Sequence, residues 1–210
     1  MPEAPLMNTE LIDSLWVLWA AALVFVMQAG FLCIEAGITR SKNAINVAMK
    51  NISDFAVAVS VFWLVGVGIM LGVSHSGWFG TSHFGWALSM DDSWLLTLFI
   101  FQAMFCATAA TIVAGAVAER MPFLGYLWLS FWVALLIYPF FGHWAWGGLI
   151  TGEPGWLEAL GFIDFAGATV VHSIGGWVAL ASVLFIGARR DRFHKDKPPT
   201  HFRAGNLPLA

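Results

Sequence analysis

Residues 164–176, "DFAGATVVHSIGG", contain a side chain whose position suggests a chemical role, His172. His172 lies in a run of otherwise apolar or small residues, eight positions after Asp164. An imidazole titrates near neutral pH, and its two nitrogens can donate and accept hydrogen bonds. Two interpretations are open. A polar group deep in an apolar helix usually faces a pathway or the bundle interior; alternatively, the ring is a neutral histidine satisfied by one hydrogen bond to a neighbouring helix.

Asp164 stands immediately before the run that carries His172. A carboxylate at this position can accept hydrogen bonds from the exposed N–H groups of the first helical turn, and it faces the positive end of the helix dipole. We therefore predict that Asp164 is a helix cap. Contact with a cationic ligand is a compatible alternative, because a fixed carboxylate also makes its surroundings more negative.

The residue types and spacings give little support for a nucleotide-binding, metal-binding or catalytic site. The sequence contains no GxxxxGK[ST] loop for nucleotide phosphate, no HExxH motif and no paired Cys/His cluster. Cys33 and Cys106 form no CxxC pattern and are interpreted as small buried hydrophobes. The remaining histidines are predicted to be solvated: His75, His83 and His143 in or beside outer loops, and His194 and His201 in a basic tail. We expect no enzyme activity, cofactor, metal or nucleic-acid partner.

The elements that must position these groups are long and apolar. The chain has 210 residues, of which 59% are hydrophobic and 11% charged, whereas a soluble globule carries about 25% charged residues. Five runs account for the difference, and each has about the 20 residues that a helix needs to cross the bilayer core. They are 15–34, 55–73, 94–118, 123–142 and 165–188. The predicted fold class is an all-α integral membrane protein with a bundle of five transmembrane helices.

Basic residues predict the orientation of these helices. If the N-terminus lies outside, all ten Lys and Arg fall on the cytoplasmic side: Arg40, Lys42, Lys50, Arg120, Arg189, Arg190, Arg192, Lys195, Lys197 and Arg203. The outer side then holds acids only: Glu3, Glu10, Asp13, Asp91, Asp92, Glu153, Glu158 and Asp164. The positive-inside rule favours this arrangement. The first 14 residues carry no Lys or Arg, so we do not expect a cleaved signal. An acidic outer face would concentrate small cations.

Within the five runs no Asp, Glu, Lys or Arg occurs, which leaves His172 as their one side chain that titrates near neutrality. Small residues recur at helical spacing at Ala103, Ala107, Ala110, Ala114 and Ala118, and at Gly175, Ala179 and Ser182. Such stripes allow close packing of membrane helices. Of the twelve Trp, five (78, 86, 94, 144 and 156) fall in or beside outer loops and are interpreted as interfacial anchors.

These residues together resemble a known family. "DFAGATVVHSIGG" is similar to the fifth-helix signature of the ammonium transporters, a family that includes methylammonium permeases and is related to Rhesus proteins. Residues 35–51, "EAGITRSKNAINVAMKN", resemble its first cytoplasmic loop. Residues 101–120, "FQAMFCATAATIVAGAVAER", resemble its third helix, and "HWAWGG", 143–148, its fourth-helix exit.

The resemblance implies a role for four positions. Phe105 matches the phenylalanine that gates the outer mouth of the pore, and Trp146 the tryptophan that lines the external ammonium-recruitment site. Asp164 matches the aspartate that supports this site. His172 matches the first of two histidines that line the narrow conduction path. The family fold has about eleven helices in two inverted five-helix repeats, and the chain corresponds to the first repeat. A homotrimer is implied as well.

The expected function is transport of ammonium or ammonia across the cell membrane: recruitment at the aromatic site, deprotonation, and passage of ammonia along a histidine-lined pore. Residues 1–188 would form the transmembrane domain. Residues 189–210 would form a basic cytoplasmic loop, where a signalling regulator could dock, and the start of a sixth span. Two alternatives stay open, an ammonium-sensing domain of a signalling protein and an inert scaffold subunit.

Overall fold

The computed structural model describes residues 6–89, 91–195 and 198–210, and Glu3 and Lys197 lie outside them. Within these ranges, five helical segments are long and apolar enough to cross a membrane: Thr9–Ile38, Ser41–Leu71, Ser93–Val117, Phe123–Trp146 and Ala168–Ile186. The order of the apolar runs in the sequence is therefore the order of the spans. The mostly helical fold is confirmed.

Three of the five spans contain a π-helical turn. The first span is the single helix α1 (Leu6–Ile38) and the third is α4 (Ser93–Val117). The second consists of α2 (Ser41–Val61), η1 (Phe62–Gly66) and α3 (Val67–Leu71). The fourth consists of α5 (Phe123–Trp132), η3 (Val133–Ile137) and α6 (Tyr138–Trp146). The fifth consists of η4 (Ala168–Ser173) and α9 (Ile174–Ile186).

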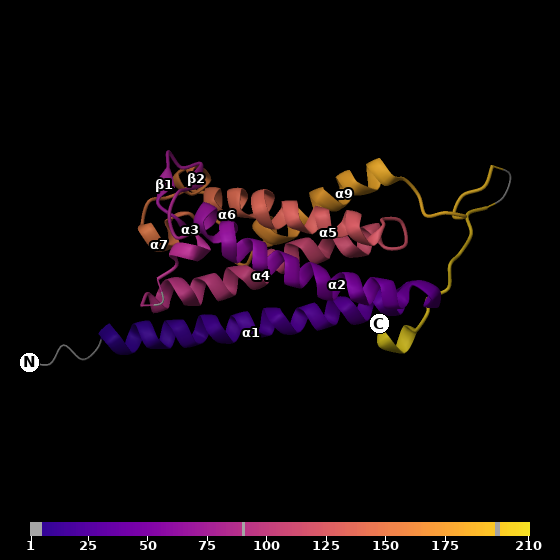
Figure 1. Ribbon diagram of the computed structural model, residues 1–210, viewed down its shortest axis with the longest axis horizontal. Helices are drawn as coiled ribbons and strands as arrows, with labels where there is room; N and C mark the ends of the chain where they lie inside the picture. The colour runs from indigo at the N-terminus through magenta and orange to yellow at the C-terminus, as the bar shows by residue number, and fades with distance from the viewer. Residues whose placement is uncertain (1–5, 90, 196–197) are drawn as a thin grey trace, which may run out of the picture.

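The connections gather at the two ends of the bundle (Figure 1). One end holds the antiparallel hairpin β1 (Ser74–His75) and β2 (Phe79–Gly80), the 3₁₀ turn η2 (Gly85–Ala87), and the short helices α7 (Gly148–Thr151) and α8 (Trp156–Ala159). The other end holds the α1–α2 junction, the α4–α5 turn and the segment after α9. Every Lys and Arg of the described chain belongs to this second end or to the helix turns near it.

Helix α4 packs against α1, α2 and α9. Its small-residue stripe at 103, 107, 110, 114 and 118 is buried throughout, with exposed fractions of 3% or less. Gly175 on α9 meets the same helix, since a Cβ at Gly175 would lie 2.7 Å from the side chain of Ile112 and 3.0 Å from the carbonyl oxygen of Ala109. Close backbone approach through small residues, as predicted, brings the helices together.

The helices extend beyond the apolar runs. Residues 35–51 resemble a cytoplasmic loop in sequence, but α1 continues to Ile38 and α2 begins at Ser41, so that only Thr39 and Arg40 separate the two helices. Hydropathy stops at the polar residues of this stretch, whereas the helices continue because several of those polar groups are buried against neighbouring helices. This part of the prediction was wrong.

The same extension changes the inventory of charges inside the bundle. Glu35, Lys50 and Asp54 lie within the first two spans and His143 within the fourth, and each is at most 5% exposed. The prediction that His172 is the one titratable group of the spans therefore holds only for the shorter apolar runs. The longer helices carry these four buried groups, and also Glu10, Asp13 and Lys42, which are exposed near the helix ends.

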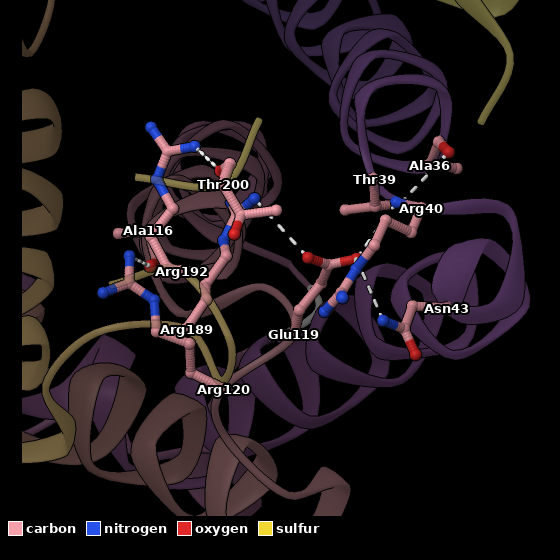
Figure 2. A network of polar contacts seen from close by, with 10 residues as sticks. All are labelled: Ala36, Thr39, Arg40, Asn43, Ala116, Glu119, Arg120, Arg189, Arg192 and Thr200. Carbon is pink, nitrogen blue, oxygen red and sulfur yellow. Dashed lines mark hydrogen bonds and ion pairs between the residues drawn. The ribbon is translucent and has the colours of Figure 1, made fainter. Parts of the chain in front are cut away.

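At the basic end, Glu119 joins three segments of the chain (Figure 2). Its side chain is 0% exposed, and its Oε1 accepts hydrogen bonds from the backbone N–H of Arg40 at 3.0 Å, from Arg40 Nε at 3.0 Å and from Asn43 Nδ2 at 2.9 Å. Its Oε2 lies 3.5 Å from Arg189 NH1. Glu119 thus links the α1–α2 junction and the segment after α9 to the end of α4. Burial alone would raise the pKa of Glu119, but the bonds from Arg40 and Asn43 hold that pKa below its usual range.

The segment after α9 returns to the same junction. The N–H of Gly205 donates to the carbonyl of Thr39 at 2.7 Å and the N–H of Asn206 donates to that of Gly37 at 3.0 Å. The 3₁₀ turn η5 (Leu207–Leu209) follows and contacts α1. The described residues of 198–206 have no helix or strand, and the proposed beginning of a sixth span stays a prediction.

We predict that Glu119→Gln lowers the free energy of unfolding by about 2 kcal/mol, since hydrogen bonds to a charged group are lost and the partner arginines are partly solvated. The loss should be fully present above about pH 4.3, the ordinary glutamate pKa, and should vanish as the pH falls through the lower pKa of folded Glu119. Unfolding of the intact protein in detergent, followed over this pH range, measures it. Glu153→Gln, in an exposed loop at the opposite end of the bundle, is the control. Equal stability of the Glu119 variant and the parent at pH 7 would contradict the proposed linkage.

Candidate functional site

The carboxylate of Asp164 accepts hydrogen bonds from the first N–H groups of the last span. Its Oδ1 accepts from the N–H of Ala168 at 3.0 Å, and its Oδ2 accepts from the N–H groups of Thr169 at 2.9 Å and Val170 at 2.7 Å. The residue is only 9% exposed. These N–H groups are the ones that a helix start leaves unpaired, so Asp164 is a cap of the fifth span, as the sequence predicted.

Between the cap and the helix lies a glycine in the left-handed region. Gly167 has φ +77°, which favours glycine because it has no Cβ. A Cβ there would lie 2.5 Å from the side chain of Val171 and 3.7 Å from the indole ring of Trp146. Gly167 therefore leaves room for the side chain of Val171 in the first turn of the fifth span.

His172 follows in the π-helical turn η4, and its side chain is exposed on the surface of the described chain. Its Nδ1 lies 3.2 Å from the carbonyl oxygen of Gly167. A carbonyl can only accept, so Nδ1 carries a proton and donates it to Gly167. Wide turns of this kind recur at functional sites. The structure thus places at this position an imidazole ring held through Nδ1, on a face that the described chain leaves uncovered.

Two aromatic rings lie beside the Asp164 turn. The ring of Phe105, on α4, stacks on that of Trp146, at the end of α6, with centroids 6.4 Å apart and an interplanar angle of 30°. The indole Nε1–H of Trp146 donates to the backbone carbonyl of Asp164 at 2.9 Å. Three of the four sequence-predicted site residues are therefore joined by direct contacts, and His172 is connected to them through the capped turn.

One further aromatic side chain belongs to this cluster. The ring of Phe101 lies 4.4 Å from that of Phe105, one helical turn away on α4. Phenylalanines four positions apart share a helix face, so the stretch "FQAMF" carried the signal for this pair. The resemblance pointed to Phe105 alone.

The loops at the hairpin end of the bundle contain a cluster of three tryptophan rings. Trp78, Trp144 and Trp156 lie 5.6–5.7 Å from one another between ring centroids, and Trp144 Nε1 donates to the carbonyl of Trp78 at 2.9 Å. These three residues join the hairpin, α6 and α8. Trp86, by contrast, is 73% exposed, as an interfacial anchor would be.

His143 is not the solvated loop residue that the sequence predicted. Its side chain is 0% exposed; Nδ1 lies 2.9 Å from the carbonyl oxygen of Met70 and Nε2 lies 3.0 Å from Ser74 Oγ. Because a carbonyl accepts only, Nδ1 donates to Met70, and Nε2 of the neutral ring accepts from Ser74. The prediction failed because α6 continues past residue 142, which brings His143 into the bundle.

The end of the bundle that holds the hairpin β1–β2 carries formal charges of a single sign among the described residues. Glu10, Asp13, Asp91, Asp92 and Glu153 belong to the helix ends and loops there. Within the described ranges no group of three His, Cys, Asp or Glu residues could hold a metal ion. An aromatic pair at an acidic end can attract a small cation through the ring faces and the long-range field.

Comparisons with known proteins agree with this geometry. The model described as the Ammonium Transporter Family matches residues 15–210. A candidate ammonium transporter of Synechocystis sp. is 50% identical over 95% of this chain and 38% of its own length. The ammonium transporter Amt2 of Archaeoglobus fulgidus is 43% identical over 97% of this chain and 44% of its own length. A solved structure described as a sensor Amt protein superposes with a TM-score of 0.88 at 44% identity, covering 94% of this chain and 50% of that one. The chain thus spans less than half the length of these two curated relatives.

We predict that Asp164→Ala lowers the free energy of unfolding by about 1–2 kcal/mol, because three N–H groups at the start of the fifth span lose their acceptor. Asp92→Ala is the matched control, since Asp92 caps α4 through a single bond from the N–H of Leu95 at 2.9 Å. Both variants are measured by denaturant unfolding of the intact protein. If the free energy of unfolding falls no further for Asp164→Ala than for Asp92→Ala, the three hydrogen bonds to Asp164 stabilise their helix start no more than one bond does.

Proposed function

This chain belongs to the ammonium transporter family, and from that premise we propose that it forms one half of a passage that moves ammonium or ammonia across the cell membrane. The observation that carries the proposal is the contact chain from Phe105 through Trp146 to Asp164, which leads into the turn that bears His172. The rings lie toward the acidic end of the bundle. Each of these residues contributes to the recruitment or to the passage of a small cation.

Recruitment takes place at the aromatic pair. The face of Trp146 attracts ammonium by cation–π contact, which contributes about 0.5–2 kcal/mol depending on desolvation. Phe105 stacks against it and closes the way inward. Asp164 keeps the indole in place through its carbonyl oxygen, and its carboxylate, already engaged by three N–H groups, adds negative potential without releasing the helix start.

Passage then requires that the ion lose its proton. A bare ammonium ion in an apolar conduit would face a Born penalty on the order of tens of kcal/mol. Neutral ammonia avoids it, and it can donate an N–H to the free Nε2 of His172. The Nδ1–H bond to Gly167 suits this task, because it leaves Nε2 of a neutral ring as the acceptor for the N–H of ammonia.

The exposed position of His172 favours a two-part passage. Five spans reverse the direction of a following copy, so an inverted second repeat would face the first across the surface that carries His172. The curated relatives are more than twice as long as the matched segment, which leaves room for such a repeat. We place the N-terminus outside, following the positive-inside rule, and expect a homotrimer from the family resemblance.

Ammonium sensing is the second candidate function. The structural likeness to a protein described as a sensor Amt protein favours it. In that case the same aromatic site binds ammonium, and the basic end passes the signal to a cytoplasmic partner. Methylammonium uptake by cells lacking their own transporters separates the two functions: uptake supports conduction, whereas ammonium-dependent thermal stabilisation without uptake supports sensing. Absence of both effects would leave the inert scaffold.

We predict that Trp146→Leu raises the KM for methylammonium uptake by roughly 2- to 30-fold with little change in the maximal rate, which is the loss of one cation–π contact. Trp128→Leu, an exposed tryptophan of α5, is the control for the loss of a large ring. Uptake is measured over a range of substrate concentrations in intact cells. An unchanged KM in the Trp146 variant would remove the recruitment role.

We predict that His172→Asp admits monovalent cations that the parent excludes, because a carboxylate in the conduit stabilises charge where an imidazole does not. Ammonium and potassium fluxes into proteoliposomes, read with a membrane-potential dye, give the selectivity. His201→Asp places the same change in the exposed inner segment and should leave the ratio as it is. A His172 variant with the parent's selectivity would count against an imidazole in the wall of the passage.

A further inference from the structure

A second polar cluster lies inside the bundle, between α1, α2, α4 and α5. It contains Gln28 of α1, Asp54 of α2, Thr111 of α4 and Tyr126 of α5. Asp54, Thr111 and Tyr126 are each 0% exposed. The hydrogen bonds of the cluster use no residue of η4 or α9, so it is separate from the site around His172.

Four oxygen–oxygen contacts run through this cluster. Thr111 Oγ1 lies 2.9 Å from Gln28 Oε1 and 3.3 Å from Asp54 Oδ2. Tyr126 Oη contacts Asp54 Oδ2 and lies 3.2 Å from the carbonyl oxygen of Ala110. Such a contact is a hydrogen bond only where one of the two oxygens donates a hydrogen, and the two hydroxyl groups supply one each. If Asp54 is ionised, two of the four contacts therefore have no hydrogen.

The side-chain amide of Gln28 does not supply the missing hydrogen. Its Nε2 donates to Thr108 Oγ1 at 3.3 Å, and the hydroxyl of Thr108 is used on the carbonyl of Met104 at 2.9 Å. If the amide of Gln28 were flipped, its Oε1 would face Thr108 Oγ1, whose hydrogen is already donated to Met104, and this contact would have no hydrogen. Gln28 Oε1 therefore faces Thr111 and takes its hydrogen, which leaves the contact between Thr111 and Asp54 to be filled from Asp54.

The surroundings of the other carboxyl oxygen also favour a protonated Asp54. Asp54 Oδ1 is buried, and none of the described residues donates a hydrogen bond to it. An ionised carboxylate with one oxygen unpaired in an apolar interior is strongly disfavoured, whereas the carbonyl oxygen of a neutral carboxyl group carries less charge to solvate. The one cation nearby, Lys50, donates to the carbonyl of Met121 at 2.6 Å instead and forms no ion pair with Asp54 among the described residues.

We propose that Asp54 is a proton-binding site within the membrane: its carboxyl group holds a proton on Oδ2 and donates it to Thr111 or Tyr126. Thr111 then donates to Gln28 and Tyr126 to Ala110, so that three hydrogens fill three of the four contacts. The ligand of the site is a proton, and the partners are hydroxyl groups from two other helices. The site is complete within this chain and does not depend on the proposed transport.

Binding of this proton couples the packing of four helices to pH. The titratable groups that interact with Asp54 are Glu35 from α1 and Tyr126 from α5, while α4 contributes the hydroxyl of Thr111. The folded state holds a proton that the solvated aspartate of an unfolded chain releases. Stability should therefore fall as the pH rises above about 4, the ordinary aspartate pKa, by at most tenfold in the unfolding equilibrium per pH unit, and should level off once folded Asp54 has released its proton.

Infrared spectroscopy of the intact protein tests the protonation directly. A neutral carboxyl group absorbs above the amide I band and an ionised one below it. With carbonyl-¹³C aspartate incorporated, we expect at pH 7 a protonated-acid band that shifts with the label, which excludes Glu35 as its source. Asp54→Asn should remove this band, and Asp92→Asn, at the solvated start of α4, should retain it. Absence of a label-sensitive band in the parent overturns the proposal.

Two further variants keep the test decisive if Asp54→Asn does not fold. Tyr126→Phe removes one hydroxyl partner and should shift the band, whereas Tyr138→Phe, a buried tyrosine bonded to Gln102 at 2.6 Å, should not. If Asp54→Asn folds, it should keep the parent's stability at pH 7, because an amide can also donate, and should lose the pH dependence of unfolding. A label-sensitive band that is unchanged in both the Asp54→Asn and the Tyr126→Phe variants would assign the proton to another aspartate and overturn the proposal.

Discussion

The carboxylate of Asp164 is the interaction on which the arrangement of the site depends. Three N–H groups of the last span end on this one side chain, and the same residue's carbonyl accepts the indole N–H of Trp146. The cap therefore sets where the π-helical turn begins, where His172 lies within it, and how the aromatic pair sits above it. The left-handed Gly167 makes this turn possible, because a Cβ there would clash with the side chain of Val171.

Three of the buried carboxyl groups meet the apolar interior in different ways. Asp164 accepts from backbone N–H groups, Glu119 lies against two arginines and an amide, and Asp54 lies among hydroxyl groups with no cation bonded to it. The three environments follow from the partners that each helix end or helix interior can offer. A charge is tolerated where donors converge on it, and the proton proposed at Asp54 is what the absence of such donors requires.

The sequence predicts the order of the spans, the small-residue stripe of α4 and the cap at Asp164, because length, helical spacing and position before a helix are local signals. The contact of Phe105 with Trp146 followed only from the family resemblance, since these residues lie on different helices. The charges of α1 and α2 and the burial of His143 were missed. Hydropathy assigns a polar residue to the membrane edge, and only the three-dimensional packing shows that Glu35 and Asp54 face partners inside the bundle.

The central claim is that the ring of His172 borders a passage for a small amine that has shed its charge. A cryo-EM structure of the intact protein in a lipid bilayer, at a resolution that shows side chains, tests it most directly. The account predicts that the exposed face of η4 is covered by protein and that His172 Nε2 points into a narrow enclosed path leading inward from Phe105. A ring in contact with acyl chains, or packed among side chains with no space beside it, would contradict the account.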